Sequence, residues 1–555
     1  MTRDHFLLMT ESTMSKSTIV SVSEKEEEDG GDQGAELLAS LGLRRGDDGL
    51  ISWRADSKDH PRNWTSLRKT FDILVIIFLE FFVTVVSTAG ASAAHAAQSH
   101  DGIGEVASIL AFAFMYNLGQ AFGGLVTPAL SELIGRRTPY LVSGAVFSVS
   151  CLVTGLQPHP SHEESSLPAV WIGRFAAGFA SAVPAVVTAG SIHDMFDGRC
   201  RVWLVAVWNA AATAGLCLGP VYGAYILAAF GGSQGWRWVF RISAAVAAGC
   251  FLCLLCVRES RPSRIMKRKL AALARTQQSK QLGSLDWFNP DHAPDASALV
   301  RLVIIQPVRL LGTEPIVIMV TMISAVSWGI IYLFTESLPG VYLSMSGAGF
   351  TRTTSSLAFL AFLPGVGLSF LPRLWDQSVV RKGLGRGEGI QPEGKIVGFA
   401  IAAPTLAIGL MWFSWTVPPA AAAAAADSQL DWLAPTAALV PIGFAVNEMA
   451  YTLSAYLTEA YQIYAASAFC GLAFIRALVS GLMPLVAQRM YPALGANIAG
   501  TVVASFAFAF CLAPWVLFRY GKLLREKSPF ARHSLESQLK SQIPSQKSLR
   551  NVSSA

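Results

Sequence analysis

The sequence predicts an all-α membrane protein with twelve transmembrane helices in two pseudo-symmetric six-helix bundles. Of its 555 residues, 52% are hydrophobic and only 14% are charged, whereas about 25% of the residues of a soluble domain are charged. The chain contains twelve apolar stretches long enough to cross a bilayer. A long polar connector separates the sixth stretch from the seventh, so the predicted helices divide into two groups of six.

The predicted spans follow one another with short polar loops between them. They occupy residues 70–92, 104–127, 138–157, 168–192, 202–229, 236–257, 314–338, 353–375, 395–417, 433–457, 463–487 and 495–519. The resulting parts are a disordered cytoplasmic N-terminal tail (1–65), an N-terminal bundle (66–258), a cytoplasmic connector (259–313), a C-terminal bundle (314–527) and a cytoplasmic tail (528–555). The two tails are predicted to be disordered because the first carries an acidic run at 24–29 and the second is rich in serine.

Charge on the loops predicts the orientation in the membrane. One set of loops carries most of the arginine and lysine, and the opposite set carries Glu163, Glu164, Asp427 and Asp431. The positive-inside rule therefore places both termini and the connector in the cytoplasm. The net charge of +6 reflects this topology, so we expect the lipid bilayer, and no nucleic acid, as a partner. Residues 267–273 of the connector could form a short basic helix on the anionic inner leaflet.

Three glycines in the fifth span form a stripe along one side of a helix. Gly215, Gly219 and Gly223 recur every four residues, and Pro220 follows the middle one. This spacing leaves a smooth face on which another helix can pack closely. Membrane helices tolerate Gly and Pro where neighbours satisfy the backbone. The stripe indicates either a general packing seam or a feature of a particular transport mechanism.

The loop after the second span combines an acid, a glycine turn and two arginines. Glu132, Gly135, Arg136 and Arg137 lie within six residues of one another. Glu132 can pair near a helix end while the arginines hold a neighbouring helix by charge and hydrogen bonds. This pattern predicts a cytoplasmic gate. Positive-inside anchoring would explain the arginines alone.

Polar groups deep within the spans are the candidates for proton coupling or for lining a substrate cavity. A buried Arg is expensive and is commonly paired or functional, and burial disfavours the charged form of a carboxyl group, so it can exchange a proton near neutral pH. For each of these residues the alternative is a structural hydrogen bond between helices. The candidates are Glu80, Asn117, Gln120, Arg174, Tyr332, Glu336, Asn447, Glu448, Tyr451 and Arg476. Aromatic residues that could line an apolar cavity are Phe81, Phe82, Phe112, Phe114, Trp328, Tyr332 and Phe334.

Nothing in the sequence indicates a cofactor, a metal or an enzyme. There is no G-x-x-x-x-G-K-[ST] run for a nucleotide, and no span holds an acid–His or Cys–His constellation. Cys250, Cys253 and Cys256 fall in an apolar helix without polar partners, so we interpret them as small apolar residues. We expect an ion gradient to supply the energy.

Several motifs resemble, in order and spacing, the signatures of the major facilitator superfamily, most closely its fungal twelve-span drug:proton antiporter branch. They are DHPRNW at 59–64, PALSELIGRR at 128–137, GRFAAG at 173–178, the stripe at 215–223, GWRW at 235–238, EPIV at 314–317, YLTEAY at 456–461, SAFCGLAFIR at 467–476 and MPLVAQRMYPALG at 483–495. Departures are mild: Glu132 and Glu459 stand where Asp is commoner, and Pro128-Ala129 replaces the usual pair.

The resemblance implies a secondary active transporter that exports small apolar or amphiphilic molecules, such as drugs, toxins or a secondary metabolite. It implies proton coupling, alternating access of the two halves, a monomer, and a location in the plasma membrane, with the vacuolar membrane as the alternative. A facilitator or importer of an organic acid, sugar or polyamine on the same fold is an alternative, although importers usually lack the stripe. A membrane sensor that transports nothing is a second alternative, against which the short tails argue.

Overall fold

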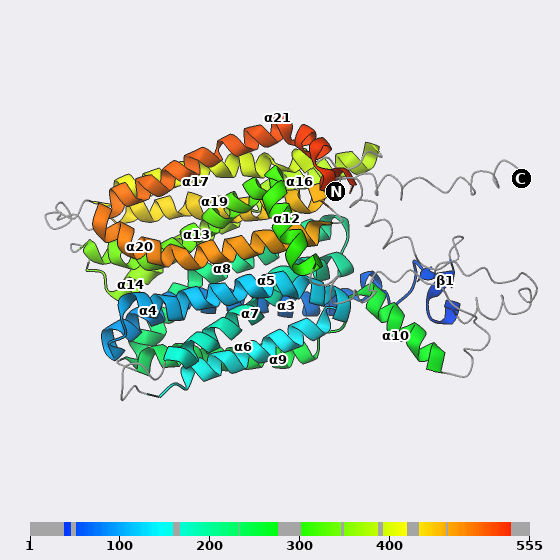
Figure 1. Ribbon diagram of the computed structural model, residues 1–555, viewed down its shortest axis with the longest axis horizontal. Coiled ribbons are helices and arrows are strands. Elements are labelled where there is room, and N and C mark those ends of the chain that lie inside the picture. Colours follow the sequence, from blue (N-terminus) through cyan, green and yellow to red (C-terminus); the bar gives the residue numbers. More distant parts are fainter. Residues whose placement is uncertain are drawn as a thin grey trace, which may run out of the picture. The chain divides into compact units, whose positions relative to one another are not determined.

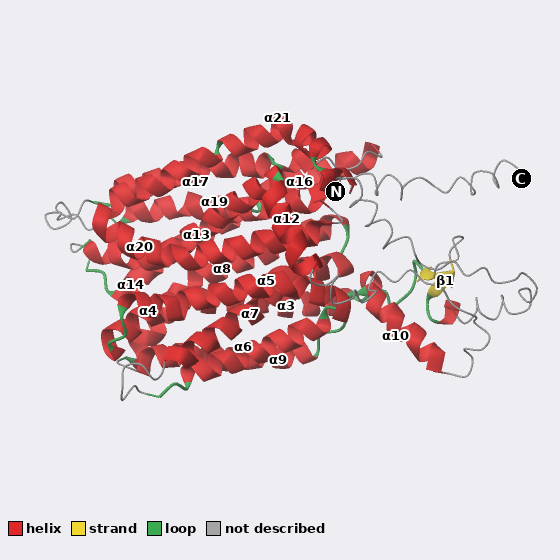
Figure 2. Ribbon diagram, in the orientation of Figure 1, coloured by secondary structure: helices red, strands yellow, loops and turns green. Residues whose placement is uncertain are grey.

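The computed structural model describes residues 38–45, 51–158, 167–231, 234–275, 301–345, 349–386, 392–418, 432–461 and 464–533. Almost all of them are helical (Figure 2). The chain divides into two compact units. Unit 1 comprises Met1–Asn63 and Ile265–Pro290, and unit 2 comprises Trp64–Arg264 and Asp291–Ala555. The predicted disorder at 1–37 and 534–555, and the acidic loop residues Glu163, Glu164, Asp427 and Asp431, lie outside the described residues.

Unit 1 corrects the expectation that the whole N-terminal segment is a disordered tail. Strands β1 (Leu43–Arg45) and β2 (Ile51–Trp53) pair antiparallel within the segment predicted to be a disordered tail, and a 3-10 turn follows at Pro61–Asn63. Helix α10 (Pro262–Arg275) is the basic helix that the sequence predicts. Its Met266 and Leu270 pack on the apolar side chains of the hairpin. Met266 and Leu270 are therefore in contact with protein on this face of the helix.

Helices α3 to α9 of unit 2 form what we call the N half. Its elements are α3 (Ser66–Asp101), α4 (Glu105–Ile109), a π-helical turn (Leu110–Phe114), α5 (Met115–Ile134), α6 (Arg137–Gly155), α7 (Leu167–Met195), α8 (Gly198–Phe230) and α9 (Gly235–Leu255). Figure 1 shows them running side by side in the lower part of the view.

Helices α13 to α21 form the C half, preceded by a π-helical turn (Arg301–Ile305) and α12 (Gln306–Thr313). Its elements are α13 (Pro315–Ser344), α14 (Arg352–Ser356), a 3-10 turn (Leu357–Ala361), α15 (Phe362–Leu368), α16 (Leu371–Arg386), a 3-10 turn (Pro392–Lys395), α17 (Val397–Thr416), α19 (Leu433–Tyr461), α20 (Ala465–Phe510) and α21 (Leu512–Lys527). The eighth predicted span is thus a chain of short pieces, since Pro364, Gly365 and Gly367 weaken a continuous helix.

Eleven helices among the described residues are long and apolar enough to cross a membrane. The last of them, Ala465–Lys527, has 63 residues, about 95 Å at 1.5 Å per residue and far longer than one crossing needs. Its backbone leaves the helical region at Gly495, where φ is 76° and ψ is 160°. The two segments on either side of Gly495 account for the difference between eleven and the predicted twelve.

Contacts between helix ends identify two ends of unit 2. We call the end where α3 begins proximal and the end where α3 finishes distal. At the distal end Asp101 accepts hydrogen bonds from Trp236 Nε1 (2.8 Å) and lies 3.2 Å from Arg237 Nη1. Arg237 Nε also donates to the carbonyl of Gln157 after α6 (2.9 Å). Both Trp236 and Arg237 are buried. The GWRW motif therefore ties three helix ends together.

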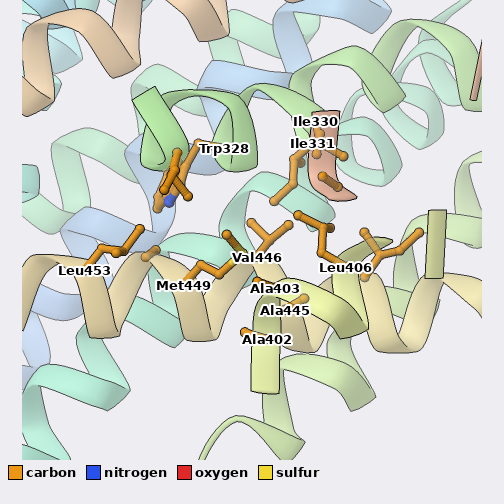
Figure 3. Close-up of a cluster of buried hydrophobic side chains, with 14 of the residues drawn as sticks. Trp328, Ile330, Ile331, Ala402, Ala403, Leu406, Ala445, Val446, Met449 and Leu453 are labelled. Atoms are coloured by element: carbon orange, nitrogen blue, oxygen red, sulfur yellow. The ribbon is translucent and has the colours of Figure 1, made fainter. Parts of the chain in front are cut away.

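The core of the C half is apolar and tightly interdigitated. Figure 3 shows side chains of α13, α17 and α19 meeting there. The labelled residues are Trp328, Ile330, Ile331, Ala402, Ala403, Leu406, Ala445, Val446, Met449 and Leu453. Small residues of α17 and α19 face each other, which lets the two backbones approach closely.

The glycine stripe of α8 packs on α3, as its spacing predicts. A methyl group at Gly215 or Gly219 would overlap carbonyl oxygens of α3, and one at Gly223 would lie 2.8 Å from Ser92 Cβ. Pro220 cannot donate to the carbonyl four residues earlier, which belongs to Leu216. Thr88 Oγ1 of α3 donates to that carbonyl instead, at 2.9 Å. The close approach and the satisfied carbonyl thus depend on each other.

We predict that Thr88→Val destabilises the protein by about 1 kcal/mol, because it leaves the Leu216 carbonyl without a donor in an apolar surrounding. Thr88→Ser should retain most of the stability. Thermal unfolding of the purified protein in detergent measures both. Thr405→Val is the matched control, since the exposed Thr405 hydroxyl donates only to Ile401 of its own helix. Equal losses for Thr88→Val and Thr405→Val would contradict the role given to Thr88.

Candidate functional site

Polar side chains from both halves meet between α3, α7, α13 and α20. Ser87 Oγ of α3 and Tyr332 Oη of α13 are hydrogen-bonded at 2.8 Å. The Arg476 guanidinium of α20 lies 4.4 Å from the centroid of the Trp328 ring. The charges of Glu80, Arg174 and Arg476 all act on Tyr332. We call Glu80, Ser87, Trp328, Tyr332 and Arg476 the central cluster.

Glu80 is the buried carboxyl group of the central cluster. Glu80 is 3% exposed, and its Oε2 has no hydrogen-bond partner among the described residues. The charge that acts on it is that of Arg476 from the opposite half. Arg476 is half-buried and stacked on Trp328. Its positive charge attracts Glu80 across the interface between the halves. The structure thus brings three predicted residues together, namely Glu80, Tyr332 and Arg476.

Arg174 has a structural set of partners. Its nitrogens donate to the carbonyls of Phe112 (2.8 Å), Val86 (3.3 Å) and Ser87 (3.3 Å). The Phe112 carbonyl lies in the π-helical turn, where the regular hydrogen-bond ladder is interrupted. The guanidinium also lies 4.4 Å from the centre of the Tyr116 ring. Arg174 therefore joins α7 to α3 and to the π-helical turn within the N half.

Asn447 forms a second polar bridge between the halves. Its Oδ1 accepts hydrogen bonds from Asn209 Nδ2 and Thr213 Oγ1 of α8, both at 2.8 Å. Its Nδ2 donates to Ser369 Oγ at 2.6 Å. Asn117 of α5 is buried and faces Gly481 of α20, where a Cβ would lie 2.9 Å from Asn117 Cβ.

Gln120 lies one turn further along α5 than Asn117 and is half-buried. The two residues share a helix face, as predicted. Asn117 Nδ2 donates to the Ala113 carbonyl of its own helix (3.1 Å), and its Oδ1 has no partner among the described residues.

Glu448 belongs to a separate ion-paired group inside the C half. It pairs with the buried Arg373 of α16 and accepts a hydrogen bond from Thr452 at 3.0 Å. Arg373 also lies 2.7 Å from Asp376 and stacks 3.6 Å from the centroid of the Tyr451 ring. The structure therefore brings Glu448 and Tyr451 together but does not bring Glu448 to Glu80, as a shared central cavity would require.

Glu336 lies one turn beyond Tyr332, toward the distal end of α13. Its Oε1 is 3.0 Å from Nε2 of His95 on α3. This pair joins the two halves, whereas the ion pairs of Glu448 and Arg136 each lie within one half.

Arg136 is the centre of the predicted gate at the proximal end. It pairs with Asp194 at the end of α7 (3.1 Å) and donates to Ser131 Oγ (2.7 Å). Burial acts to lower the pKa of Arg136, but the Asp194 carboxylate outweighs this effect and raises it. The backbone N–H groups of Arg136 and Arg137 donate to Glu259 after α9 (2.7 and 3.2 Å).

The acid that pairs with Arg136 is therefore Asp194. Glu132 is the partner that the sequence predicts, but it is half-buried and acts on Arg136 only through its charge. Gly135 has a φ of 95°, and a Cβ there would lie 2.7 Å from the Glu259 carboxyl carbon. Arg137 Nη2 donates to the Leu255 carbonyl at 3.0 Å. These contacts hold α5, α6, α7 and α9 together.

The C half has a comparable group at its proximal end. Lys395, before α17, pairs with Glu459 near the end of α19. Glu393 accepts from Arg525 of α21 through both carboxylate oxygens (2.9 and 2.8 Å). Glu314 accepts from Tyr461 Oη at 3.0 Å. The EPIV and YLTEAY motifs thus meet at one place.

The expected aromatic lining is corrected in part. Phe82, Phe112 and Phe334 are buried in the cores of their own halves. Trp328 and Tyr332 lie in the central cluster.

Sequence reasoning missed His95, Arg373, Asp194, Glu259, Asn209 and Thr213. Arg373 is an ionisable residue within the predicted span 353–375, so the rule that selected Glu80 could have found it. His95 lies three residues beyond the predicted span 70–92, because helix α3 continues to Asp101.

We predict that Arg136→Ala destabilises the protein by about 2 kcal/mol, since it removes the guanidinium that is paired with Asp194 in a mostly buried site. Arg137→Ala should have a smaller effect, because its side chain makes one half-exposed hydrogen bond and its backbone contact to Glu259 remains. Thermal unfolding in detergent compares the two. Equal destabilisation would contradict the assignment of Arg136 as the centre of this group.

The fold and the cluster define a class of protein: a helical membrane protein of two halves, with polar residues of both halves at their interface. Residues 73–517 match the family model of the Major Facilitator Superfamily. The chain belongs to this family.

Similar proteins include fungal members of the family. An "Ascochitine biosynthesis cluster MFS transporter" of Didymella fabae is 29% identical over 492 residues, covering 87% of this chain and 90% of that protein. "Multidrug transporter TPO1_2" of Candida glabrata is 27% identical and covers 85% and 78%. A solved structure of the proton:xylose symporter XylE has a TM-score of 0.55 at 16% identity, covering 82% and 97%. The likeness to XylE shows the fold.

Proposed function

We propose that the protein is a proton-coupled exporter of small apolar or amphiphilic molecules that works by alternating access. The observation that carries the proposal is Glu80, a buried carboxyl group whose charge is met by Arg476 from the other half. Movement of one half against the other changes this attraction. Proton uptake by Glu80 is thereby linked to the arrangement of the halves.

Export is supported by the relatives, which are named as multidrug or biosynthesis-cluster transporters. Secondary transporters of this kind place their binding site near the bilayer midplane between the halves, where α3, α13 and α20 bring the central cluster together. We further propose a monomer in the plasma membrane, with the proximal end in the cytoplasm. The arginine and lysine residues at the proximal end support this orientation. The protein would accordingly carry no enzymatic activity.

The carbonyl contacts of Arg174 and the ion pair of Glu448 assign these residues to the frame of each half. Glu80 is therefore our candidate for the coupling carboxyl group, and Arg476, Trp328 and Tyr332 would contact the substrate. Arg476 supplies charge and hydrogen-bond donors, and Trp328 supplies an apolar ring face.

We predict that Glu80→Gln abolishes proton-driven accumulation while ligand binding survives, because Gln keeps size and hydrogen bonding but cannot titrate. The purified protein would be reconstituted into liposomes with an acidic interior, and uptake of an amphiphilic dye such as rhodamine 6G measured. Dye binding would be followed in detergent by fluorescence.

Glu105→Gln is the matched control, since Glu105 is exposed at the distal end. Glu448→Gln should instead lower the melting temperature, because it leaves the buried Arg373 with a weaker partner. Normal pH-driven accumulation by Glu80→Gln would overturn the assignment of Glu80. Dye uptake that is independent of the pH gradient in the wild type would favour a facilitator.

A further inference from the structure

The histidine–carboxylate pair at the distal end lies where the two halves must separate if that end opens. His95 Nε2 of α3 and Glu336 Oε1 of α13 are 3.0 Å apart, with side-chain exposures of 30% and 4%. The same two helices are joined deeper in the unit by Ser87 and Tyr332. Opening of α3 from α13 at the distal end therefore breaks the pair.

Burial makes this contact sensitive to charge. Glu336 Oε2 has no hydrogen-bond partner among the described residues, so an ionised Glu336 depends on a nearby cation. Opposite charges attract strongly in a surrounding of low dielectric constant. Histidine is the side chain whose charge ordinarily changes between pH 5 and 8. A proton on His95 therefore converts a hydrogen bond into an ion pair.

The charged groups around His95 come from two neighbouring elements. Glu336 of α13 attracts its proton, and Arg352 of α14 repels it. Gln98, one turn further along α3, hydrogen-bonds His95 and also donates to Ser108 Oγ of α4 at 2.6 Å. Arg352 therefore disfavours a positive charge on His95, whereas Glu336 favours it.

We propose that His95 and Glu336 form a proton-dependent latch that closes the distal end of the interface between the halves. The attraction is strongest when His95 carries a proton and is positively charged. It weakens as pH rises and His95 loses its proton. The latch rests on the proposed alternating access, but it does not require that Glu80 carries the transported proton.

Spin labels on either side of the latch measure its closure directly. Gly104 in the N half and Gly340 in the C half are suitable sites, because a Cβ at either position meets nothing within 4 Å. Exposed Cys200, Cys253 and Cys256 would first be replaced by serine. Double electron–electron resonance on the full chain in lipid nanodiscs then gives the distance between the labels.

Lowering the pH from about 8 to about 6 should raise the ratio of short-distance to long-distance populations about fivefold or more, the usual range of coupling between sites. His95→Lys should keep the short distance at both pH values, since lysine stays charged. His95→Gln should increase the long-distance population and remove the pH response. Glu336→Gln should also weaken the pH response.

His100→Gln is the matched control, because His100 is an exposed histidine of the same helix; it should behave like the wild type. A pH response that survives in His95→Gln, or that is lost equally in His100→Gln, would overturn the latch. Glu80→Gln separates the two proposals: a retained distance response with lost dye accumulation supports both, and a retained response with normal accumulation overturns only the role of Glu80.

Discussion

The structure depends on one constraint: a polar group buried in hydrocarbon must find its partner within the chain. Pro220 removes a helical donor, and Thr88 of the neighbouring helix supplies another. The π-helical turn frees the Phe112 carbonyl, and Arg174 donates to it. In both places a carbonyl group that lacks its helical donor on one helix accepts a hydrogen bond from a polar side chain of a neighbouring helix.

The fold was largely predictable because the constraint acts on length and composition. Apolar runs of bilayer length gave the spans, and the glycine stripe correctly indicated close helix packing. The exceptions are local: the 3-10 turn Leu357–Ala361 and the turn at 369–370 divide the eighth span, and the paired strands β1 and β2 pack with Met266 and Leu270 of the connector. Such a contact between distant segments leaves no periodic signal in either of them.

The site was predictable in kind but not in pairing. Depth in a span selected Glu80, Tyr332 and Asn447, which are buried, and Arg476, which is half-buried. Depth does not say which of these residues face each other. Glu448 lies at a similar depth to Asn447 in the same helix, yet Glu448 turns to Arg373 inside its half and Asn447 turns to α8 of the other half. Adjacent residues on a helix point about 100° apart, so the placement of the neighbouring helices decides which partner each residue meets.

The distribution of partners separates rigid parts from moving ones. Arg136, Arg373, Lys395 and Arg525 all pair with acids of their own half, so each half can move as a body without losing those pairs. Between the halves lie weaker or charge-dependent contacts, such as the hydroxyl pair Ser87–Tyr332 and the amide bridge of Asn447. Contacts of this kind can be broken and replaced by others with only a small change in free energy. A protein that alternates between two arrangements requires that the two differ little in free energy. In the proposed mechanism, the Glu80–Arg476 attraction and the His95–Glu336 pair are two contacts of this interface whose strength depends on protons, and they lie at different depths. A change in proton occupancy can therefore act on the centre and on the distal end of the interface separately, while the ion-paired frames of the two halves remain intact.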